Sequence, residues 1–195
     1  RFAAVNAWEK HMRTLIIAAL LLLHGAAFAQ ETNKPAMSYS FGEIRYVDVD
    51  DGGNGFKLAG SYQFTTHWIG VASFRSLDFR NSVEVSSFEI GAGYIYPVRQ
   101  NWDLQANARV IRTEVDSRFG SGDDTGIGLL GGLRGMVIPE LEIRGNVHYV
   151  NIEESDVFLE LAGDWYITPR FAAGLSVEFG GDVDLWTIGA RYFFK

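Results

Sequence analysis

The sequence predicts an all-β protein, an antiparallel up-and-down transmembrane β-barrel with ten strands. Three observations support this fold class. Apolar and polar residues alternate with a period of two along most of the chain, clusters of Gly, Pro, Asn and Asp interrupt the alternation, and the polar faces carry equal numbers of acids and bases. With 195 residues, 47% of them hydrophobic, the chain has enough apolar material for one ordinary domain.

The N-terminal part resembles a targeting leader. Met12-Arg13 precedes an apolar run from Leu15 to Leu23, and Ala27-Phe28-Ala29 forms a small-x-small cleavage pattern before Gln30. The run is shorter than the roughly 20 residues that a spanning helix needs. We therefore expect two parts: residues 1–29, which are upstream residues plus a secretory signal peptide from Met12 to Ala29, and residues 30–195, which form the barrel.

The strands follow in order from the alternation. In residues 56–64, for example, Phe56, Leu58, Tyr62 and Phe64 share one face, and polar residues alternate with them. Segments 102–110 and 141–149 repeat the pattern. The predicted strands are 39–49, 55–64, 68–77, 83–96, 102–115, 125–138, 141–152, 157–167, 171–179 and 184–194. The first, third and sixth alternate least regularly, so eight strands is the alternative.

The connections between these strands alternate in kind. Tight turns at 65–67, 97–101, 139–140 and 168–170 alternate with mostly longer loops rich in Asp and Gly, which is the pattern of successive hairpins. The loop side carries fourteen acids (Asp48, Asp50, Asp51, Asp78, Glu84, Glu114, Asp116, Asp123, Asp124, Glu153, Glu154, Asp156, Asp182 and Asp184) and three bases (Arg80, Arg112 and Arg118). We therefore expect the two ends of the barrel to face different environments.

The charges on the polar faces indicate which face points inward. They comprise seven acids (Glu43, Glu89, Asp103, Glu142, Glu160, Asp164 and Glu178) and seven bases (Arg45, Lys57, Arg75, Arg109, Arg134, Arg144 and Arg191). A solvated surface has no reason to balance its signs, whereas the interior of a small barrel must pair its charges. We therefore predict a polar lumen and a lipid-facing apolar surface. A soluble lipocalin-like barrel, with its apolar face inward around a ligand, is the contrasting hypothesis.

Aromatic residues and strand lengths fit a membrane barrel. Aromatic residues of the apolar faces lie near the strand ends, as in the interfacial girdles of membrane barrels: Tyr62, Phe64, Trp68, Tyr94, Tyr96, Trp102, Trp165, Phe171, Tyr192 and Phe194 by the tight turns, and Tyr46, Phe74, Phe88, Tyr149, Phe179 and Trp186 toward the loops. A tilted strand of roughly 9–11 residues crosses the bilayer. Closing the first strand onto the last leaves no unpaired backbone edge in hydrocarbon.

These features resemble the small outer-membrane β-barrel proteins of Gram-negative bacteria, of the OmpA type in the broad sense. The resemblance rests on the leader ending at Ala29, the hairpin units 55–73 and 91–108, and the last strand, Leu185 to Phe194. It implies a place in the outer membrane, contact with lipid and lipopolysaccharide, a monomer, and a terminal aromatic strand that the barrel-insertion machinery reads. Lys195 extends one residue beyond that strand. The family includes structural proteins, adhesins, narrow pores and a few enzymes.

Composition excludes several function classes. The chain has no cysteine, so disulfides, thiolate metal sites and cysteine nucleophiles are excluded. A net charge of −7 argues against nucleic acid as a partner, because no basic stripe is present.

Two segments resemble known ligand-binding loops. The segment Asp48 to Asn54 has the carboxylate spacing of a calcium loop but departs from the EF-hand pattern at Gly52 and Ala59, so a solvated acidic turn is favoured. The run Gly126 to Gly132 lacks the Lys-Ser/Thr of a phosphate loop and alternates like a strand, so close packing in a barrel wall is favoured.

Histidine offers the one catalytic candidate. His148, followed by Glu153, Glu154 and Ser155, has the residue types of an outer-face hydrolase, but a hydrogen-bonded histidine in the lumen is favoured. We assign no catalytic, cofactor-binding or metal residue and expect no enzyme activity and no cofactor. The expected function is a structural outer-membrane barrel with a filled lumen and acidic extracellular loops, serving surface interaction or envelope integrity. The alternatives are a narrow pore, the lipocalin-like binder and an outer-surface hydrolase.

Overall fold

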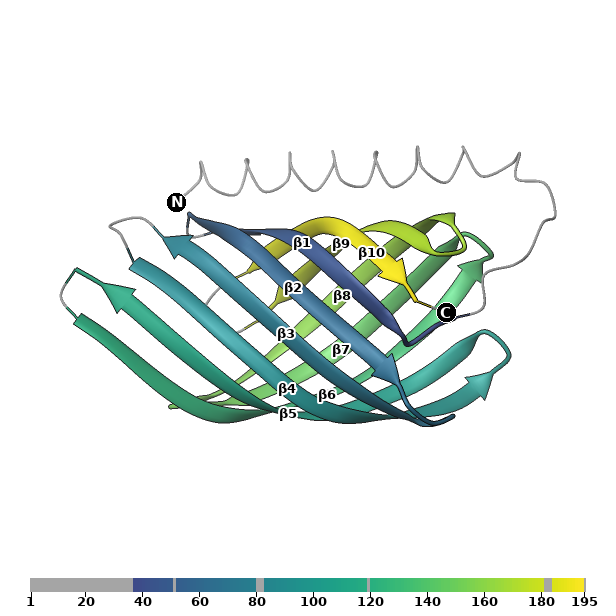
Figure 1. Ribbon diagram of the computed structural model, residues 1–195, viewed down its shortest axis with the longest axis horizontal. Coiled ribbons are helices and arrows are strands. Elements are labelled where there is room, and N and C mark those ends of the chain that lie inside the picture. Colours follow the sequence, from purple (N-terminus) through teal and green to yellow (C-terminus); the bar gives the residue numbers. More distant parts are fainter. Residues whose placement is uncertain (1–36, 51, 80–82, 119, 181–183, 195) are drawn as a thin grey trace. The chain divides into compact units, whose positions relative to one another are not determined.

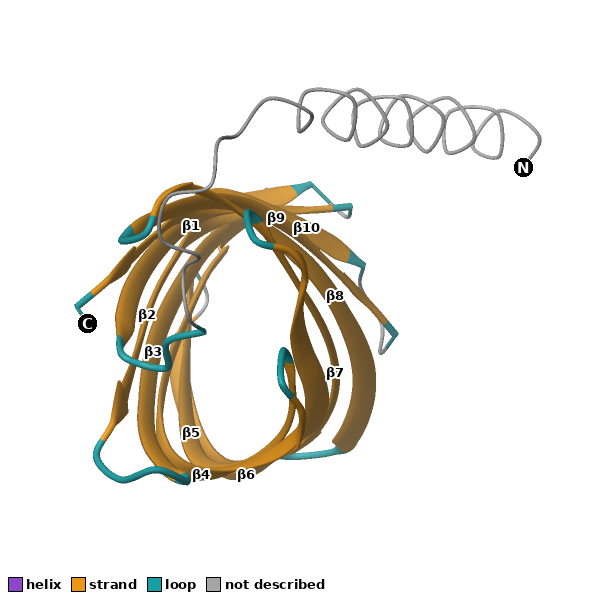
Figure 2. Ribbon diagram, turned by 90° about the vertical axis from the view of Figure 1, so that its right-hand side faces the viewer, coloured by secondary structure: helices purple, strands orange, loops and turns teal. Residues whose placement is uncertain are grey.

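Ten antiparallel strands form one closed barrel in the computed structural model of the chain, which describes residues 37–50, 52–79, 83–118, 120–180 and 184–194 (Figure 1). The strands follow one another around the ring in sequence order, and β10 closes onto β1 (Figure 2). Their bounds are β1 Phe41–Val49, β2 Gly53–Gln63, β3 Trp68–Phe79, β4 Val83–Arg99, β5 Trp102–Ser117, β6 Gly120–Ile138, β7 Leu141–Asn151, β8 Ser155–Thr168, β9 Phe171–Phe179 and β10 Leu185–Phe193. The prediction of ten strands is confirmed, and the alternative of eight is wrong.

The closing ladder runs along the whole of β1. Pairing with β10 extends from Phe41 opposite Phe193 to Val49 opposite Leu185. All ten strands therefore have a neighbour on both sides, which membrane hydrocarbon requires because it offers no water to an unpaired amide. The tight turns join β2 to β3, β4 to β5, β6 to β7 and β8 to β9, and this end of the barrel is called the tight-turn end. The opposite end is the loop end.

One predicted loop is mostly strand. The interval 116–124 was expected to be a loop, but β5 continues to Ser117 and β6 begins at Gly120. The β5–β6 ladder continues residue pair by residue pair as far as Ser117 opposite Gly120. Gly120 has a positive φ, which glycine adopts without steric cost. The extension places Asp116, Asp123 and Asp124 on strands, and the loop-end acids Asp48, Asp78, Glu84, Glu114 and Asp156 also lie on strands. Asp51, Asp182 and Arg80 lie outside the described residues.

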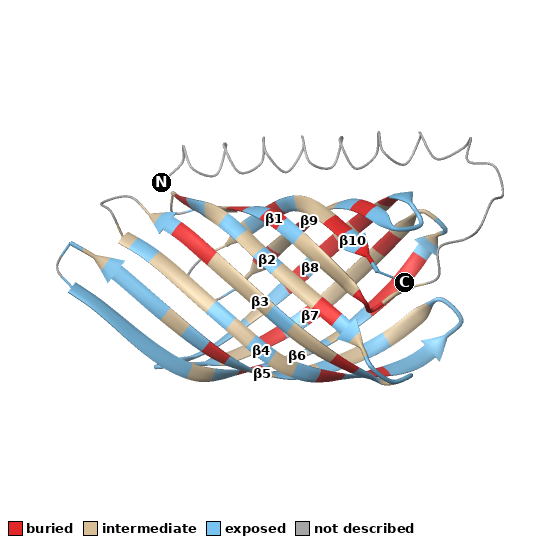
Figure 3. Cartoon of the chain, in the orientation of Figure 1, coloured by how far each residue is buried: buried red, intermediate tan, exposed pale blue. Residues whose placement is uncertain are grey.

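Burial is inverted relative to a soluble protein. Leu58 and Leu104, on the outer face, are 43% and 47% exposed, whereas Arg191, on the inner face, is 0% exposed. Exposed and buried positions alternate along the strands in Figure 3. An apolar outer surface is stable only against lipid, so the predicted orientation of the faces is confirmed. The lipocalin-like hypothesis is wrong for the same reason, because it requires the apolar face to line the lumen.

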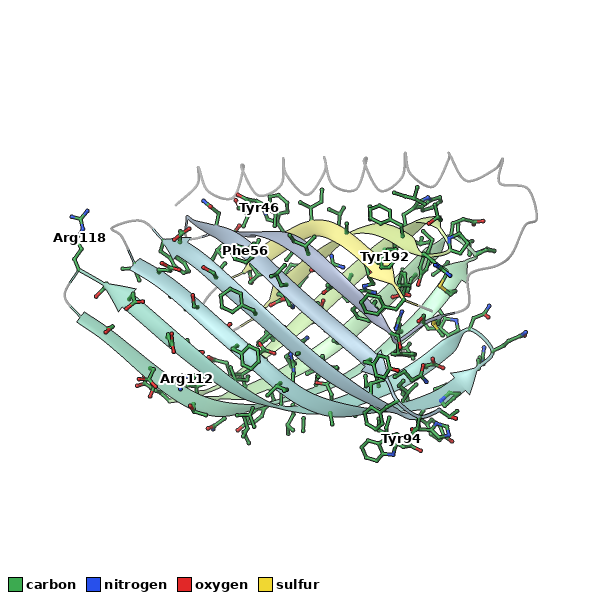
Figure 4. The ribbon with its side chains drawn as sticks, in the orientation of Figure 1. Tyr46, Phe56, Tyr94, Arg112, Arg118 and Tyr192 are labelled. Atoms are coloured by element: carbon green, nitrogen blue, oxygen red, sulfur yellow. The ribbon has the colours of Figure 1, made fainter. Side chains whose placement is uncertain are left out.

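The outer surface carries exposed aromatic residues at both ends. At the tight-turn end they are Tyr62, Phe64, Trp68, Tyr94, Tyr96, Phe171, Tyr192 and Phe194, and toward the loop end Tyr46, Phe88 and Trp186. In Figure 4, Tyr46 and Tyr94 point away from the barrel. This distribution is that of the aromatic girdles at the two interfaces of a bilayer. Among the described residues, no helix has the length and hydrophobicity of a membrane span.

Candidate functional site

The lumen is the candidate functional site, because it holds the polar chemistry of the membrane-spanning part. The seven acids and seven bases of the predicted polar faces all point into it, as their burial, ion pairs and cavity contacts indicate: Glu43, Arg45, Lys57, Arg75, Glu89, Asp103, Arg109, Arg134, Glu142, Arg144, Glu160, Asp164, Glu178 and Arg191. The strand pleat explains this, since alternate residues of each strand point to one face.

Arg191, on β10, is the centre of the densest group of ion pairs. Its Nη2 lies 2.7 Å from Oε2 of Glu43, and its Nη1 lies 3.2 Å from Oε1 of Glu142 and 3.4 Å from Oδ2 of Asp164. Arg45 joins the same acids, with its Nη2 2.8 Å from Oδ1 of Asp164 and its Nε 3.3 Å from Oε2 of Glu43. We call these five residues the Arg191 cluster. They come from β1, β7, β8 and β10, so the cluster ties the closing seam to β7 and β8, on the other side of β9.

Further donors complete the coordination of Glu142. Arg134 donates from Nη2 to Oε2 of Glu142 at 2.7 Å, and the Tyr166 hydroxyl donates to the same oxygen at 2.8 Å. Arg144 lies 3.0 Å from Oδ2 of Asp164 through its Nη2. Both carboxylates therefore have several charged or hydroxyl partners, as buried charges require.

The Arg191 cluster has room for the Asp164 carboxylate because residue 174 is a glycine. A Cβ added there would collide with the Asp164 carboxylate and the Gly163 carbonyl oxygen. We expect Gly174→Ala to lower the free energy of unfolding by about 1–3 kcal/mol, because the Asp164 carboxylate must shift away from its arginines. Urea unfolding of the protein in lipid vesicles measures this. Gly163→Ala is the matched control, since its Cβ meets no heavy atom within 4 Å; an equal loss in both variants would contradict the explanation.

His148 belongs to a second polar group on β4, β5, β7 and β8. Its Nε2 lies 3.2 Å from Oε2 of Glu160, its Nδ1 lies 3.1 Å from Nη2 of Arg109, and its ring stacks on Phe158 at 4.6 Å between centroids. Arg109 also forms an ion pair with Glu89. The ring is thus a hydrogen-bonded lumen histidine. Glu153, Glu154 and Ser155, the residues considered beside it in a hydrolase, are absent from these contacts.

A cavity of about 120 Å³ lies beside these groups. Its wall combines charged residues, among them Lys57, Arg109 and Arg144, with the small side chains of Ala59, Ser61 and Ser73. Several buried polar atoms on its lining have no hydrogen-bond partner among the described residues: Ser61 Oγ, Asn107 Oδ1, Arg109 Nε, Arg134 Nε and Arg144 Nε. Such atoms are normally satisfied by water, so the polar lining fits a hydrated cavity.

The residues of the candidate calcium loop have other partners. Asp48, the penultimate residue of β1, accepts hydrogen bonds from two aromatic side chains. Its Oδ1 accepts from Trp186 Nε1 at 3.2 Å, and its Oδ2 accepts from the Tyr46 hydroxyl at 3.4 Å. Asp51 lies outside the described residues. In the part of the chain that the structure describes, no group of three or more His, Asp or Glu side chains is arranged to hold a metal.

The glycine run 126–132 lies within β6. A Cβ at Gly126 would collide with the Asn151 carbonyl oxygen, and one at Gly132 with the Asn146 side chain. Close packing against β7 therefore accounts for both glycines, as the alternation indicated.

The role of residues 37–40, which directly precede β1, was not predicted from the sequence. The first strand was predicted from residue 39 but begins at Phe41, because Tyr39 turns into the lumen, where its hydroxyl donates to Oδ2 of Asp103 at 2.9 Å. The available signal was the phase of the alternation: Tyr39 and Phe41 share the odd-numbered face with Glu43 and Arg45, so two aromatic residues lie on the polar side of the first strand.

A closed antiparallel barrel with an apolar outer surface and an ionised lumen is a transmembrane β-barrel of the small outer-membrane type. Neither a family model nor a curated protein sequence matches the chain. Among solved structures, the KdgM porin is similar with a TM-score of 0.52 at 12% identity, over 80% of this chain and 99% of that one.

Two further solved structures have related barrels. The NanC porin has a TM-score of 0.51 at 7% identity, over 77% of this chain and 98% of that one. Ail, the attachment invasion locus protein of Yersinia pestis, has a TM-score of 0.40 at 18% identity, over 78% of this chain and 94% of that one. At such identities the likeness to the two porins shows the fold alone.

Proposed function

We propose that the protein is a closed structural barrel of the outer membrane, with no cofactor and no catalysis. The observation that carries this proposal is the Arg191 cluster, in which carboxylates and guanidinium groups occupy the lumen instead of open water. In a barrel of about eight to ten strands, side chains are expected to fill the interior. The apolar outer surface anchors the barrel in lipid, and the paired charges keep it closed.

The proposed partners follow from the apolar outer surface and from the acidic loop end. Outer-membrane lipid covers the belt of exposed aliphatic and aromatic side chains, and lipopolysaccharide lies beside the acidic loop end. The last strand carries Tyr192 on its outer face and is followed by the exposed Phe194, and we propose that the barrel-insertion machinery reads it. We propose a monomer, because β1 and β10 pair with each other and leave no open edge for another copy.

The refolded wild-type protein is expected to show no discrete conductance steps in a planar lipid bilayer, because its lumen is filled. A larger open porin, inserted under the same conditions, is the control for detection. Steady single-channel conductance of the wild-type protein would overturn the closed barrel.

A narrow pore is the second candidate, and the polar cavity of about 120 Å³ favours it. The two similar structures with TM-scores above 0.5 are porins by name. The same conductance measurement distinguishes the two candidates.

A further inference from the structure

Residues 37–40, which directly precede β1, cross the inside of the tight-turn end. We call Met37 to Ser40 the N-terminal strap. Its contacts reach strands on several sides of the barrel: Met37 packs on the apolar cluster of Met136, Tyr166, Ala172 and Phe193, the Ser38 carbonyl oxygen accepts from Arg134 Nη2 at 2.9 Å, and Ser40 Oγ accepts from the Gln63 amide at 3.1 Å. The strap therefore lies across this mouth of the barrel and is not simply a continuation of β1.

Tyr39 is the deepest residue of the strap. It is 4% exposed and packs against Ile69 and Ile95. Its hydroxyl donates to Oδ2 of Asp103 at 2.9 Å, and the Arg134 guanidinium carbon lies 4.3 Å from its ring centroid. The ring thus joins an apolar layer to the polar lumen, with a cation–π contact and a charge-assisted hydrogen bond holding it in place.

The cavity lies directly behind this ring. Tyr39 and Ile69 form part of its lining, together with Lys57, Ser61 and Ser73. The Arg191 cluster occupies the part of the wall formed by β1, β7, β8 and β10, whereas these small side chains come from β2 and β3. The cavity thus lies between the two: Glu43 of the Arg191 cluster, Arg144 and Glu160 line it from one part of the wall, and small side chains together with Tyr39 line it from the other.

Water access differs along the inner face of β3. Arg75, two residues beyond the lining Ser73 toward the loop end, has a side chain that is 22% exposed, whereas Ile69, six residues nearer the tight turn, is only 3% exposed. On β4, Ile95 is also buried, at the same level as Tyr39. The barrier to water on this side is thus the apolar layer of Tyr39, Ile69 and Ile95.

The strap is held mainly by side chains. The backbone hydrogen bond that ties it to a strand joins the Phe194 amide to the Ser40 carbonyl oxygen at 2.9 Å. Ile69 and Ile95 belong to strands paired on both sides, so moving either of them requires breaking a ladder. Segments with few ladder bonds open at a lower free-energy cost than strands do, so the strap is the part of the layer that can move.

We propose that the N-terminal strap is a removable plug, and that withdrawing Tyr39 connects the polar cavity to the tight-turn end as a narrow path for water and small inorganic ions. The barrel is then a gated pore whose closed form is the structure described above. The path runs along the small side chains of β2 and β3, and Glu43 of the Arg191 cluster also lines it.

The test compares full-length variants refolded into a planar bilayer in potassium chloride. Tyr39→Ala is expected to produce discrete conductance steps, because it removes the ring and leaves the strands unchanged. Tyr39→Phe is expected to stay mostly closed, since it retains the ring but loses the hydrogen bond to Asp103. Tyr46→Ala is the matched control, because it removes a tyrosine from the lipid-facing side and is expected to stay silent.

The outcomes separate the plug from the closed barrel of the proposed function. Conductance in the wild-type protein overturns the closed barrel, whereas silence in both the wild type and a folded Tyr39→Ala overturns the plug. Circular dichroism establishes whether each variant has folded. If Tyr39→Ala does not fold, Tyr39→Gln decides: its amide can still donate to Asp103 but the ring is gone, so discrete conductance steps support the plug and silence overturns it.

Discussion

Replacing Arg191 with methionine is expected to lower the free energy of unfolding by about 3–5 kcal/mol, the range for breaking a buried ion pair by removing one partner. Methionine retains much of the side-chain volume but leaves Glu43, Glu142 and Asp164 without their shared guanidinium, which is 0% exposed. Urea unfolding of the protein in lipid vesicles, followed by tryptophan fluorescence, measures the change.

Arg112→Met is the matched control for this prediction. Arg112 also contacts two acids, Glu114 at 3.2 Å and Asp123 at 3.1 Å, but its side chain is 57% exposed. Figure 4 places it on the extended β5–β6 part at the loop end. Water and salt screen such pairs, so the expected loss is below about 1 kcal/mol. Similar losses in the two variants would mean that the lumen cluster is solvated and does not close the barrel.

Replacing Leu58 with arginine is expected to lower the free energy of unfolding by about 2–4 kcal/mol in lipid vesicles, because it places a charge near the middle of the lipid-facing surface. Leu58 lies at the centre of β2 and is 43% exposed. In a water-soluble protein, the same substitution at an exposed position has little effect. The size of the loss therefore tests whether lipid is the medium outside the barrel.

Tyr62→Arg, on the same strand and the same face, is the control. Tyr62 lies one residue from the end of β2 at the tight turn, where an arginine reaches the interface and the expected loss falls to about 0–1 kcal/mol. Equal effects at the two positions would contradict a bilayer whose midplane lies near Leu58.

The sequence alone was sufficient for the fold class because a strand is a local pattern. Alternation in segments such as 56–64 and 102–110 identified individual strands, and turn residues separated them. The balance of seven acids and seven bases on one set of faces then identified the inner side. Where a segment is polar on both faces, alternation does not indicate where the strand pairing ends. The extension of β5 and β6 was missed for this reason.

The candidate site was predicted as a set of residues but not as an arrangement. Sequence analysis identified Arg191, Glu43 and Asp164 as lumen charges, and it assigned no pairs among them. His148 was correctly favoured as a hydrogen-bonded lumen residue, but its partners Arg109 and Glu160 were not predicted. Tyr39 was assigned to a strand: the phase of the alternation places it on the polar side, but that phase does not show whether the residue begins a ladder.

The sequence by itself determined ten alternating segments, an ionised face and an apolar face, since each depends on residues within one strand. Only the tertiary structure decided which charges meet, because Arg191 and Glu43 are 148 residues apart and Arg45 and Asp164 are 119 apart. Those contacts depend on the register around the whole ring and on its closure between β1 and β10. Ion pairing in the lumen is therefore a consequence of barrel geometry, which no single strand contains.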